Sequence, residues 1–253
     1  MARIIAIANQ KGGVGKTTTS VNLAASLAAL ERRTLLVDMD PQGNATTGLG
    51  VDADALDNTV YEVLIDKIPV DDAIMDTEIK FLQVMPSNTR LFGAQIELVS
   101  TIAREHKLRK AIETFEDDYD YILIDCPPSL GILTLNALAA AKSVLIPIQC
   151  EYYALEGVGQ LLNSIRLVQK NINSGLSIEG ILLTMYDSRL NLSRQVLEEV
   201  RSYFDDRVYE TVISRNVKLS EAPSFGKPII LYDILSSGAK AYIKLAKEVD
   251  SHA

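Results

Sequence analysis

The chain has 253 residues, of which 47% are hydrophobic and 23% are charged, a composition typical of a globular protein. It contains no run of 18 apolar residues, which excludes a membrane-spanning helix by the usual length criterion. Its net charge of −8 argues only weakly against a nucleic-acid partner, because residues 181–253 hold ten basic and ten acidic residues and can still form a local basic face.

The first residues of the chain and its two cysteines indicate the cellular compartment in which the protein is expected. The first residues lead straight into an apolar run without the basic region and cleavage site of a secretory signal, so we expect none. Cys126 and Cys150 each lie beside an apolar run. They are predicted to be reduced, buried thiols of a cytoplasmic protein rather than a disulfide.

Short runs rich in Ile, Leu and Val alternate along the chain with stretches of helical periodicity. The expected strands are 4–8, 34–38, 121–125, 143–148 and 178–184, and the expected helices include 17–31, 134–142 and 157–171. The strand runs are continuously apolar, which is typical of strands buried on both faces of a parallel sheet. The order predicts a three-layer α/β fold with helices on both faces of a twisted, mostly parallel sheet. Without a repeat or a linker, residues 1–253 are predicted to form one domain.

The segment "NQKGGVGKTT" (9–18) follows the first expected strand. Gly15, Lys16 and Thr17 match the end of the phosphate-binding pattern G-x-x-x-x-G-K-[ST], although Gln10 stands in place of the first glycine. The alternative, a flexible glycine turn, is disfavoured by the position between a buried strand and a helix. Lys16 is expected to contact the β- and γ-phosphates of a nucleotide, and Thr17 to bind Mg²⁺. The predicted nucleotide-binding residues of this loop are Lys11, Gly12, Gly13, Val14, Gly15, Lys16, Thr17 and Thr18.

Carboxylates follow two further strands. Asp125 ends "YILID" and has the position of a magnesium-binding aspartate, the alternative being a residue that caps the next turn. Asp38 and Asp40 follow the second strand. The carboxyl ends of parallel strands meet at one edge of a sheet, so these groups should lie near the glycine loop. For Asp38 a structural role is as well supported as support of the magnesium shell.

Three motifs in order, "KGGVGKTT", "LLVDMDPQGNAT" (35–46) and "ILIDCPPSLG" (122–131), resemble the deviant Walker A ATPases. The similarity continues through "PIQCEYYALEG" (147–157) and "VKLSEAPSFGKPI" (217–229) and covers essentially the whole chain. It points to the ParA/Soj chromosome-partitioning branch, in its short form without a separate N-terminal DNA-binding domain. This resemblance implies a P-loop fold, a weak ATPase activity with ATP and Mg²⁺ as cofactors, and an ATP-dependent homodimer.

The resemblance also implies roles for single residues. Lys11 would reach across the dimer interface to the partner's phosphates, and with Lys16 and Asp40 it would form the catalytic set. Asp40 would position the attacking water and, with Thr17 and Asp125, belong to the metal site. Arg215 and Asn216 would lie near the base, although Ser214 stands where the family tends to have a proline.

The output implied for this branch is segregation of a chromosome or plasmid. The dimer would bind double-stranded DNA non-specifically through Arg189, Lys218 and Arg215, whose alternative reading is ordinary solvated surface arginine or lysine. Hydrolysis, stimulated by the N-terminal segment of a ParB/Spo0J-type protein, would release it. The protein is thus expected in the cytoplasm, associated with the nucleoid and without stable membrane insertion.

Three other outputs stay open at this point. A MinD-like membrane-cycling cell-division ATPase would need a basic amphipathic helix at its C-terminus, whereas Tyr242, Leu245 and Val249 are predicted to form the core face of a packed last helix. Electron transfer, as in the nitrogenase iron protein, would need cluster-binding cysteines, and neither cysteine has a suitable context. A non-catalytic DNA-binding module is disfavoured by Asp40 and the two loop lysines.

Overall fold

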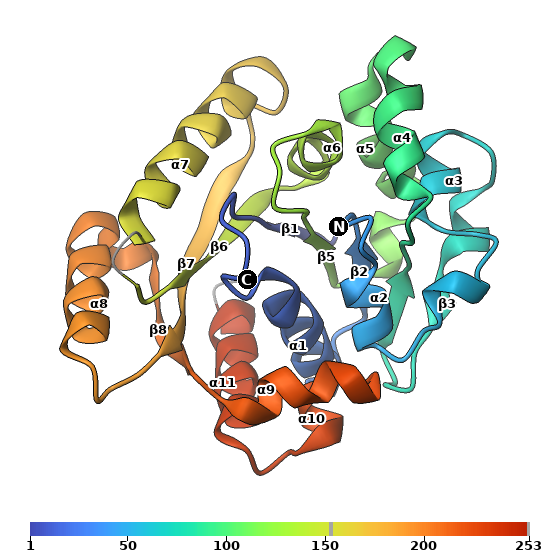
Figure 1. Ribbon diagram of the computed structural model, residues 1–253. Coiled ribbons are helices and arrows are strands. Elements are labelled where there is room, and N and C mark those ends of the chain that lie inside the picture. The colour runs from blue at the N-terminus through green and yellow to red at the C-terminus, as the bar shows by residue number, and fades with distance from the viewer. Residues whose placement is uncertain (152–153, 252–253) are drawn as a thin grey trace.

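A computed structural model describes residues 1–151 and 154–251. An eight-stranded sheet runs through it in the order β3-β4-β2-β5-β1-β6-β7-β8 (Figure 1). The strands are β1 Arg3–Ile7, β2 Thr34–Asp38, β3 Met75–Asp76, β4 Leu82–Met85, β5 Tyr121–Asp125, β6 Ser143–Gln149, β7 Ser177–Tyr186 and β8 Val208–Ser214. All neighbouring strands are parallel except β3, which pairs antiparallel with β4.

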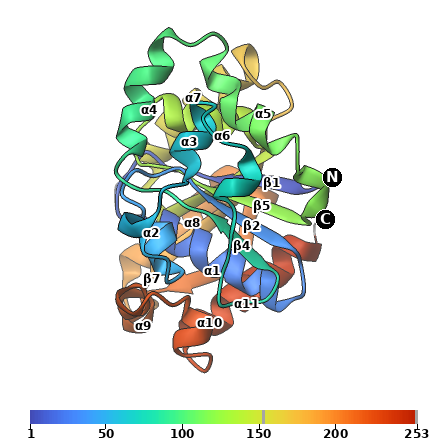
Figure 2. The ribbon, with the colours of Figure 1, turned by 90° about the vertical axis from the view of Figure 1, so that its right-hand side faces the viewer.

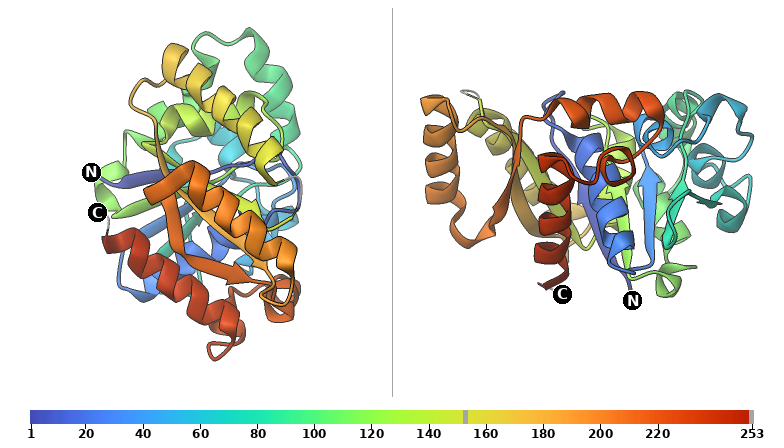
Figure 3. Two further views of the ribbon diagram at one scale, coloured as in Figure 1. Left: turned by 90° about the vertical axis from the view of Figure 1, so that its left-hand side faces the viewer. Right: turned by 90° about the horizontal axis from the view of Figure 1, so that it is seen from below.

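Helices cover both faces of this sheet (Figures 1 and 3). One layer contains α1 Lys16–Ala29, α2 Asn44–Gly48, α9 Val217–Glu221, α10 Ile229–Tyr232 and α11 Ser237–Ser251. The other contains α3 Val60–Leu64, α4 Leu91–Glu97, α5 Lys107–Ile112, α6 Ile132–Ala140, α7 Ala154–Asn171 and α8 Asn191–Phe204. Short 3₁₀ turns join several of these helices. The predicted three-layer, mostly parallel α/β fold is confirmed.

The continuous apolar sequence of β1 follows from its central place. Ile4 and Ala6 point into the core cluster beneath α3 to α8, whereas Ile5 and Ile7 point into the cluster beneath α1 and α11. A strand with helices on both faces has no solvent side, so every position along it is apolar. At the sheet edge β8 alternates instead, with Tyr209, Thr211 and Ile213 buried.

The expected elements agree with the observed ones to within three residues at each end. The strands β3, β4 and β8 were not anticipated. β3 and β4 have two and four residues, and β8 alternates polar and apolar residues, so none shows the continuous apolar run that identified the central strands. The predicted last helix is confirmed as α11, whose Tyr242, Leu245 and Val249 are buried against α1 and the sheet.

The seven parallel strands, all except β3, place their following loops on one side of the molecule. In Figure 2 the chain enters β1 from the right, and α2, α4 and α9 lie on the left, toward which β1 runs. The loops after β1, β2 and β5 therefore meet at this edge. This arrangement brings the motifs of the sequence together.

Candidate nucleotide-binding site

The glycine loop joins β1 to α1 and is held from two neighbouring strands. Asn9 donates from Nδ2 to the carbonyl of Pro147 in β6 (2.7 Å) and accepts from the Lys11 amide (3.0 Å). Thr184, near the end of β7, donates from Oγ1 to the carbonyl of Val14 (2.8 Å). These contacts fix both halves of the loop.

Gly15 makes the turn from the loop into the helix. Its φ of 86° and ψ of 26° lie in the left-handed region, which a residue with a Cβ adopts only with strain. The next residue, Lys16, begins α1, so the unpaired amides and the positive end of the helix dipole face the space above the loop. A loop of this shape at a helix N-terminus is suited to bind phosphate.

Asp125, at the end of β5, lies directly beside the first turn of α1. Its Oδ2 accepts from Thr17 Oγ1 (2.8 Å), and its Oδ1 accepts from Ser20 Oγ (2.7 Å). The carboxyl group is fully buried, and this burial, together with the charge of Asp38, raises its pKa to about 7. Such a carboxylate is best stabilised as an anion by a nearby cation.

Ser20 was not anticipated from the sequence. It lies three residues after Thr17 and therefore on the same face of the helix, a spacing that could have indicated it once Asp125 was assigned.

Lys16 is a buried cation whose charge interacts with Asp125 and Asp40. Its Nζ donates to the backbone carbonyl of Lys11 (3.2 Å). Burial lowers the pKa of Lys16, while the charges of Asp125 and Asp40 act in the opposite direction. The lysine is thus positioned inside the loop.

Asp38 and Asp40 organise the loop after β2. Asp38 is paired in register with Asp125 on the adjacent strand. Its Oδ2 accepts from both the amide (2.9 Å) and the hydroxyl (2.8 Å) of Thr46, and its Oδ1 accepts from the Asp40 amide (3.1 Å). Burial raises the pKa of Asp38 to about 6, although the bonds from Thr46 lower it. These contacts favour the structural reading of Asp38, which holds Asp40 in place.

Thr46 connects three segments and was not singled out in the sequence. Besides its bonds to Asp38, its Oγ1 accepts from the Ser87 amide (2.9 Å) that follows β4. It closes the second motif, "LLVDMDPQGNAT", so its position in that motif was the available signal.

Lys11 differs from Lys16 in its surroundings. Its side chain is half-exposed and lies 3.7 Å, Nζ to Oε2, from Glu151 after β6. The side chain is thus directed to Glu151, whereas the Lys11 backbone bonds within the loop, its amide to Asn9 and its carbonyl to Lys16. The two lysines of one glycine turn therefore have separate surroundings.

A cavity of about 350 Å³ adjoins the loop at Gly15 and Thr18. It extends between the ends of β7 and β8, α9 and α11, and Arg215 and Asn216 line it. The Asn216 amide also caps α9, accepting from the Lys218 amide (2.8 Å) and donating to Ser237 Oγ (2.6 Å). The position fits a nucleotide base beside the phosphate loop.

The expected DNA-contacting residues lie at the same edge of the sheet. The Arg189 side chain is 85% exposed and forms a two-bond pair with Asp187 (2.9 and 2.7 Å). Lys218 pairs with Glu221 (3.1 Å), and Arg215 is exposed at the end of β8. The structure thus places the three basic groups on the surface, two of them with an acidic neighbour of their own.

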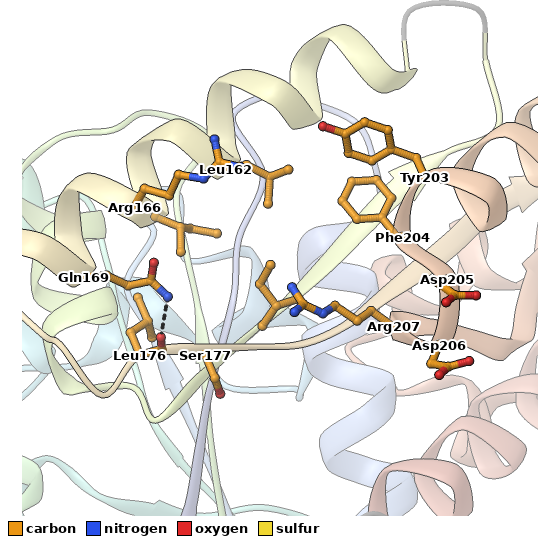
Figure 4. Close-up of a pocket in the computed structure, with 12 residues that line it drawn as sticks. Leu162, Arg166, Gln169, Leu176, Ser177, Tyr203, Phe204, Asp205, Asp206 and Arg207 are labelled. Carbon is orange, nitrogen blue, oxygen red and sulfur yellow. Dashed lines mark hydrogen bonds between the residues drawn. The ribbon is translucent and has the colours of Figure 1, made fainter.

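A larger cavity lies elsewhere. About 770 Å³ in volume, it opens between α7 and α8, where Leu162, Arg166, Tyr203 and Phe204 face one another (Figure 4). It is bordered by the beginning of β7 and by the turn before β8, at the opposite end of these strands from the glycine loop. None of the candidate residues lines it, so it is separate from the nucleotide site.

The oxygen groups of Thr17 and Asp125 fit a magnesium ion that is bound together with the phosphates of a nucleotide. Among the described side chains, those of residues 1–151 and 159–251, no group of three or more His, Cys, Asp and Glu is arranged to hold a metal alone. The Thr17 hydroxyl and the buried Asp125 carboxylate are oxygen groups of the kind that Mg²⁺ prefers, and phosphate oxygens and water would complete its shell.

Fold and site together define the class: a P-loop ATPase with a second lysine in its loop. A family model described as an AAA domain matches residues 2–178. The sporulation initiation inhibitor protein Soj of Bacillus subtilis (strain 168) is 62% identical over 249 residues, which cover 98% of each chain. The chromosome partitioning protein ParA of Myxococcus xanthus (strain DK1622) is 60% identical, covering 98% of this chain and 88% of that one. The chain belongs to the Soj/ParA family of P-loop ATPases.

A solved structure with a bound nucleotide has the same fold. Cobyrinic acid a,c-diamide synthase from Mycobacterium smegmatis, crystallised with ADP and magnesium, superposes with a TM-score of 0.88 at 41% identity, covering 100% of this chain and 95% of that one. The expected cofactors, ATP and Mg²⁺, are confirmed for the fold and family by such neighbours. No helix among the described residues is long and apolar enough to cross a bilayer.

Proposed function

We propose that this protein is an ATP-dependent DNA-partitioning ATPase whose nucleotide state controls a dimer. The observation that carries the proposal is the separation of the two loop lysines. Lys16 lies inside its own loop, whereas the Lys11 side chain is half-exposed and paired with Glu151, from which it would turn to reach a second subunit. The names of the Soj and ParA relatives, 62% and 60% identical, support partitioning as the output.

The chain's own residues have distinct tasks in this proposal. The loop amides and Lys16 bind the phosphates of ATP, and Thr17 and Asp125 hold magnesium, which neutralises charge on the β- and γ-phosphates when bound. Asp40, positioned by Asp38, orients the water that attacks the γ-phosphorus, so that the bond to the β-phosphate oxygen breaks and ADP and phosphate form. The partner subunit supplies its Lys11 as a second cation, much as an arginine finger does. Arg215 and Asn216 border the base.

The dimer would then bind DNA through Arg189, Lys218 and Arg215, located on the same edge as the nucleotide. Contacts of this kind reach phosphates only and weaken steeply with salt. Hydrolysis, stimulated by the N-terminal segment of a ParB/Spo0J-type partner, releases the DNA. In this scheme residues 1–253 act as one domain, in the cytoplasm and on the nucleoid.

The membrane-cycling alternative is less well supported. It requires the apolar face of the last helix to be free for a bilayer, but in α11 Tyr242, Leu245 and Val249 are buried. Exposing them would remove the cover of α1. The electron-transfer alternative is also poorly supported. It requires cysteine thiolates as cluster ligands, but burial raises the pKa of both thiols, that of Cys150 to about 12, and so favours their protonated form.

The test is binding to a random-sequence DNA duplex with ADP and with ATP, for the wild type and for Asp40→Ala. The proposal expects tight, salt-sensitive binding only with ATP, prolonged in the variant because hydrolysis is slowed. Arg189→Ala is expected to weaken this binding while leaving nucleotide-dependent dimerisation intact. The absence of DNA binding in every state would contradict the proposal and direct attention to liposome binding.

A further inference from the structure

A row of apolar side chains lies exposed on α4 and the turn that follows it. Phe92, Ile96, Val99 and Ile102, which we call the apolar stripe, are 49%, 78%, 63% and 93% exposed. The first three are four and three residues apart, so they lie on one face of the helical segment. Glu97 is the only charged residue from 91 to 103, and its carboxylate accepts from Tyr61 OH (2.6 Å).

The core does not need this face of α4. Leu91, Ala94 and Leu98, on the opposite side of the segment, are already buried in the cluster beneath α3 to α8. The outward residues are therefore additional apolar surface on a short helix. This surface has few charged residues and several large apolar ones. Such a composition is typical of the centre of a protein interface and not of a helix face that is exposed to solvent.

The position of the stripe relates it to the nucleotide site. Figure 2 shows α4 on the side of the molecule toward which β1 runs, with α2 and α9. Gln95 of α4 lies beside the loop after Asp125, because a methyl group built on Gly131 would be 3.7 Å from its Oε1. Leu130 of that loop is itself 38% exposed. The helix that carries the first half of the stripe thus lies beside the loop that follows the candidate magnesium ligand.

A second copy of this chain is the occupant that fits best. The only group assigned so far to the proposed dimer interface is Lys11 of the glycine loop, a charged side chain that supplies little apolar area. Stable interfaces bury about 800 Å² on each partner. Four side chains of this size and exposure offer on the order of 400 Å² of apolar surface, which would make up much of the remainder. A stripe near a two-fold axis would pack against its own copy, as isologous interfaces do.

We infer that the apolar stripe is the hydrophobic part of the ATP-dependent dimer interface, packed against the same stripe of a second copy. The inference rests on the proposed function, since it assigns a surface to the dimer proposed there. It also relates the loop after Asp125 to the interface, because Gln95 of α4 lies beside Gly131 of that loop.

The experiment is sedimentation velocity over a range of protein concentrations with magnesium and ATP, in the Asp40→Ala background. The test variants are Ile96→Glu and Ile102→Glu, both at exposed positions where the fold does not require the apolar side chain. Leu235→Glu is the matched control, because Leu235 is 76% exposed in the turn before α11 on the other face of the sheet. Binding of a fluorescent ATP analogue at low protein concentration checks the monomeric site.

Each test variant is expected to raise the concentration needed for dimerisation by tenfold or more, while the control stays within twofold and nucleotide binding by the monomer is unchanged. A wild-type dimer that both test variants form equally well would overturn this inference and leave the proposed function intact. If dimerisation of the test variants is unchanged but they no longer bind another protein, the inference is likewise overturned and the stripe is a docking surface for that protein. No ATP-dependent dimer in the parent chain would overturn both proposals.

Discussion

At the scale of single residues, the two lysines of the glycine loop differ in what they can reach. The Lys16 side chain is enclosed by its own loop, with its Nζ on the carbonyl of Lys11 and the carboxylates of Asp125 and Asp40 nearby. Among the residues that the structure describes, the Lys11 side chain forms a long, half-exposed pair with Glu151, and such pairs contribute about 0–1 kcal/mol. Lys11 is therefore easily redirected toward another subunit.

The substitutions Lys11→Ala and Lys16→Ala should separate these roles. Lys16→Ala should weaken ATP binding by the isolated subunit, because it removes the buried cation of the loop. Lys11→Ala should leave that binding within about threefold, since the backbone carbonyl that holds Lys16 remains, but should lower ATP turnover by roughly 10²-fold or more. Equilibrium titration with a fluorescent nucleotide and steady-state phosphate release measure the two quantities. Equal loss of binding in both variants would show that Lys11 acts within its own subunit.

At the scale of elements, α11 is a core helix. Its apolar residues complete the cluster shared with α1, and Tyr242 OH lies 3.2 Å from Thr19 Oγ1 of that helix. Because α1 begins at the glycine loop, the packing of α11 indirectly supports the phosphate site. A helix in this role is not free to enter a membrane surface.

Replacement of Leu245 by alanine tests this reading. Removing a buried leucine side chain should lower the free energy of unfolding by about 2–5 kcal/mol, because a cavity is left in the core. Lys244→Ala, one position away on the exposed side, should change it by no more than about 0.5 kcal/mol. Urea denaturation followed by circular dichroism gives both values. Unchanged stability of the leucine variant, together with loss of vesicle binding, would instead favour a membrane role for α11.

At the scale of the whole molecule, the site is assembled by the order of the sheet. Asp38 and Asp125 are far apart in the sequence but lie in register on adjacent strands, and β1 places the glycine loop on the other side of β5. The groups that would hold a nucleotide and its metal therefore come from separate segments. Binding at such a junction stabilises the entire fold, because the ligand contacts the native arrangement only.

Magnesium should add measurably to this stabilisation through Thr17. At a concentration 100 times its dissociation constant, a ligand stabilises a protein by about 2.7 kcal/mol, which raises Tm by roughly 5–10 °C at this chain length. In the wild type, Mg²⁺ with ADP should raise Tm more than ADP with EDTA. In Thr17→Ala this increment should be lost, because the hydroxyl beside Asp125 is removed. Thr18 borders the base cavity instead, so the Thr18→Ala variant should keep the additional rise in Tm that Mg²⁺ gives in scanning calorimetry. An increment that persists without Thr17 would remove that residue from the metal site.

The central fold and the phosphate loop could be predicted from the sequence because their signals are local. A strand covered on both faces must be apolar throughout, and a chain that turns from strand to helix around a phosphate needs glycines and a lysine within eight residues. Strands β1, β2 and β5 and the loop from Lys11 to Thr18 were recognisable for these reasons.

Only the tertiary structure decided which polar groups meet and which apolar groups remain outside. Ser20 became a partner of Asp125, and Thr46 joined Asp38 to Ser87, because adjacent strands brought their ends together. The exposure of Ile96 was likewise hidden, since the periodicity of α4 is apolar on both sides and does not show which side the core will cover. Contacts between distant segments depend on strand order and packing, and the periodicity of a short stretch of sequence contains no information about either.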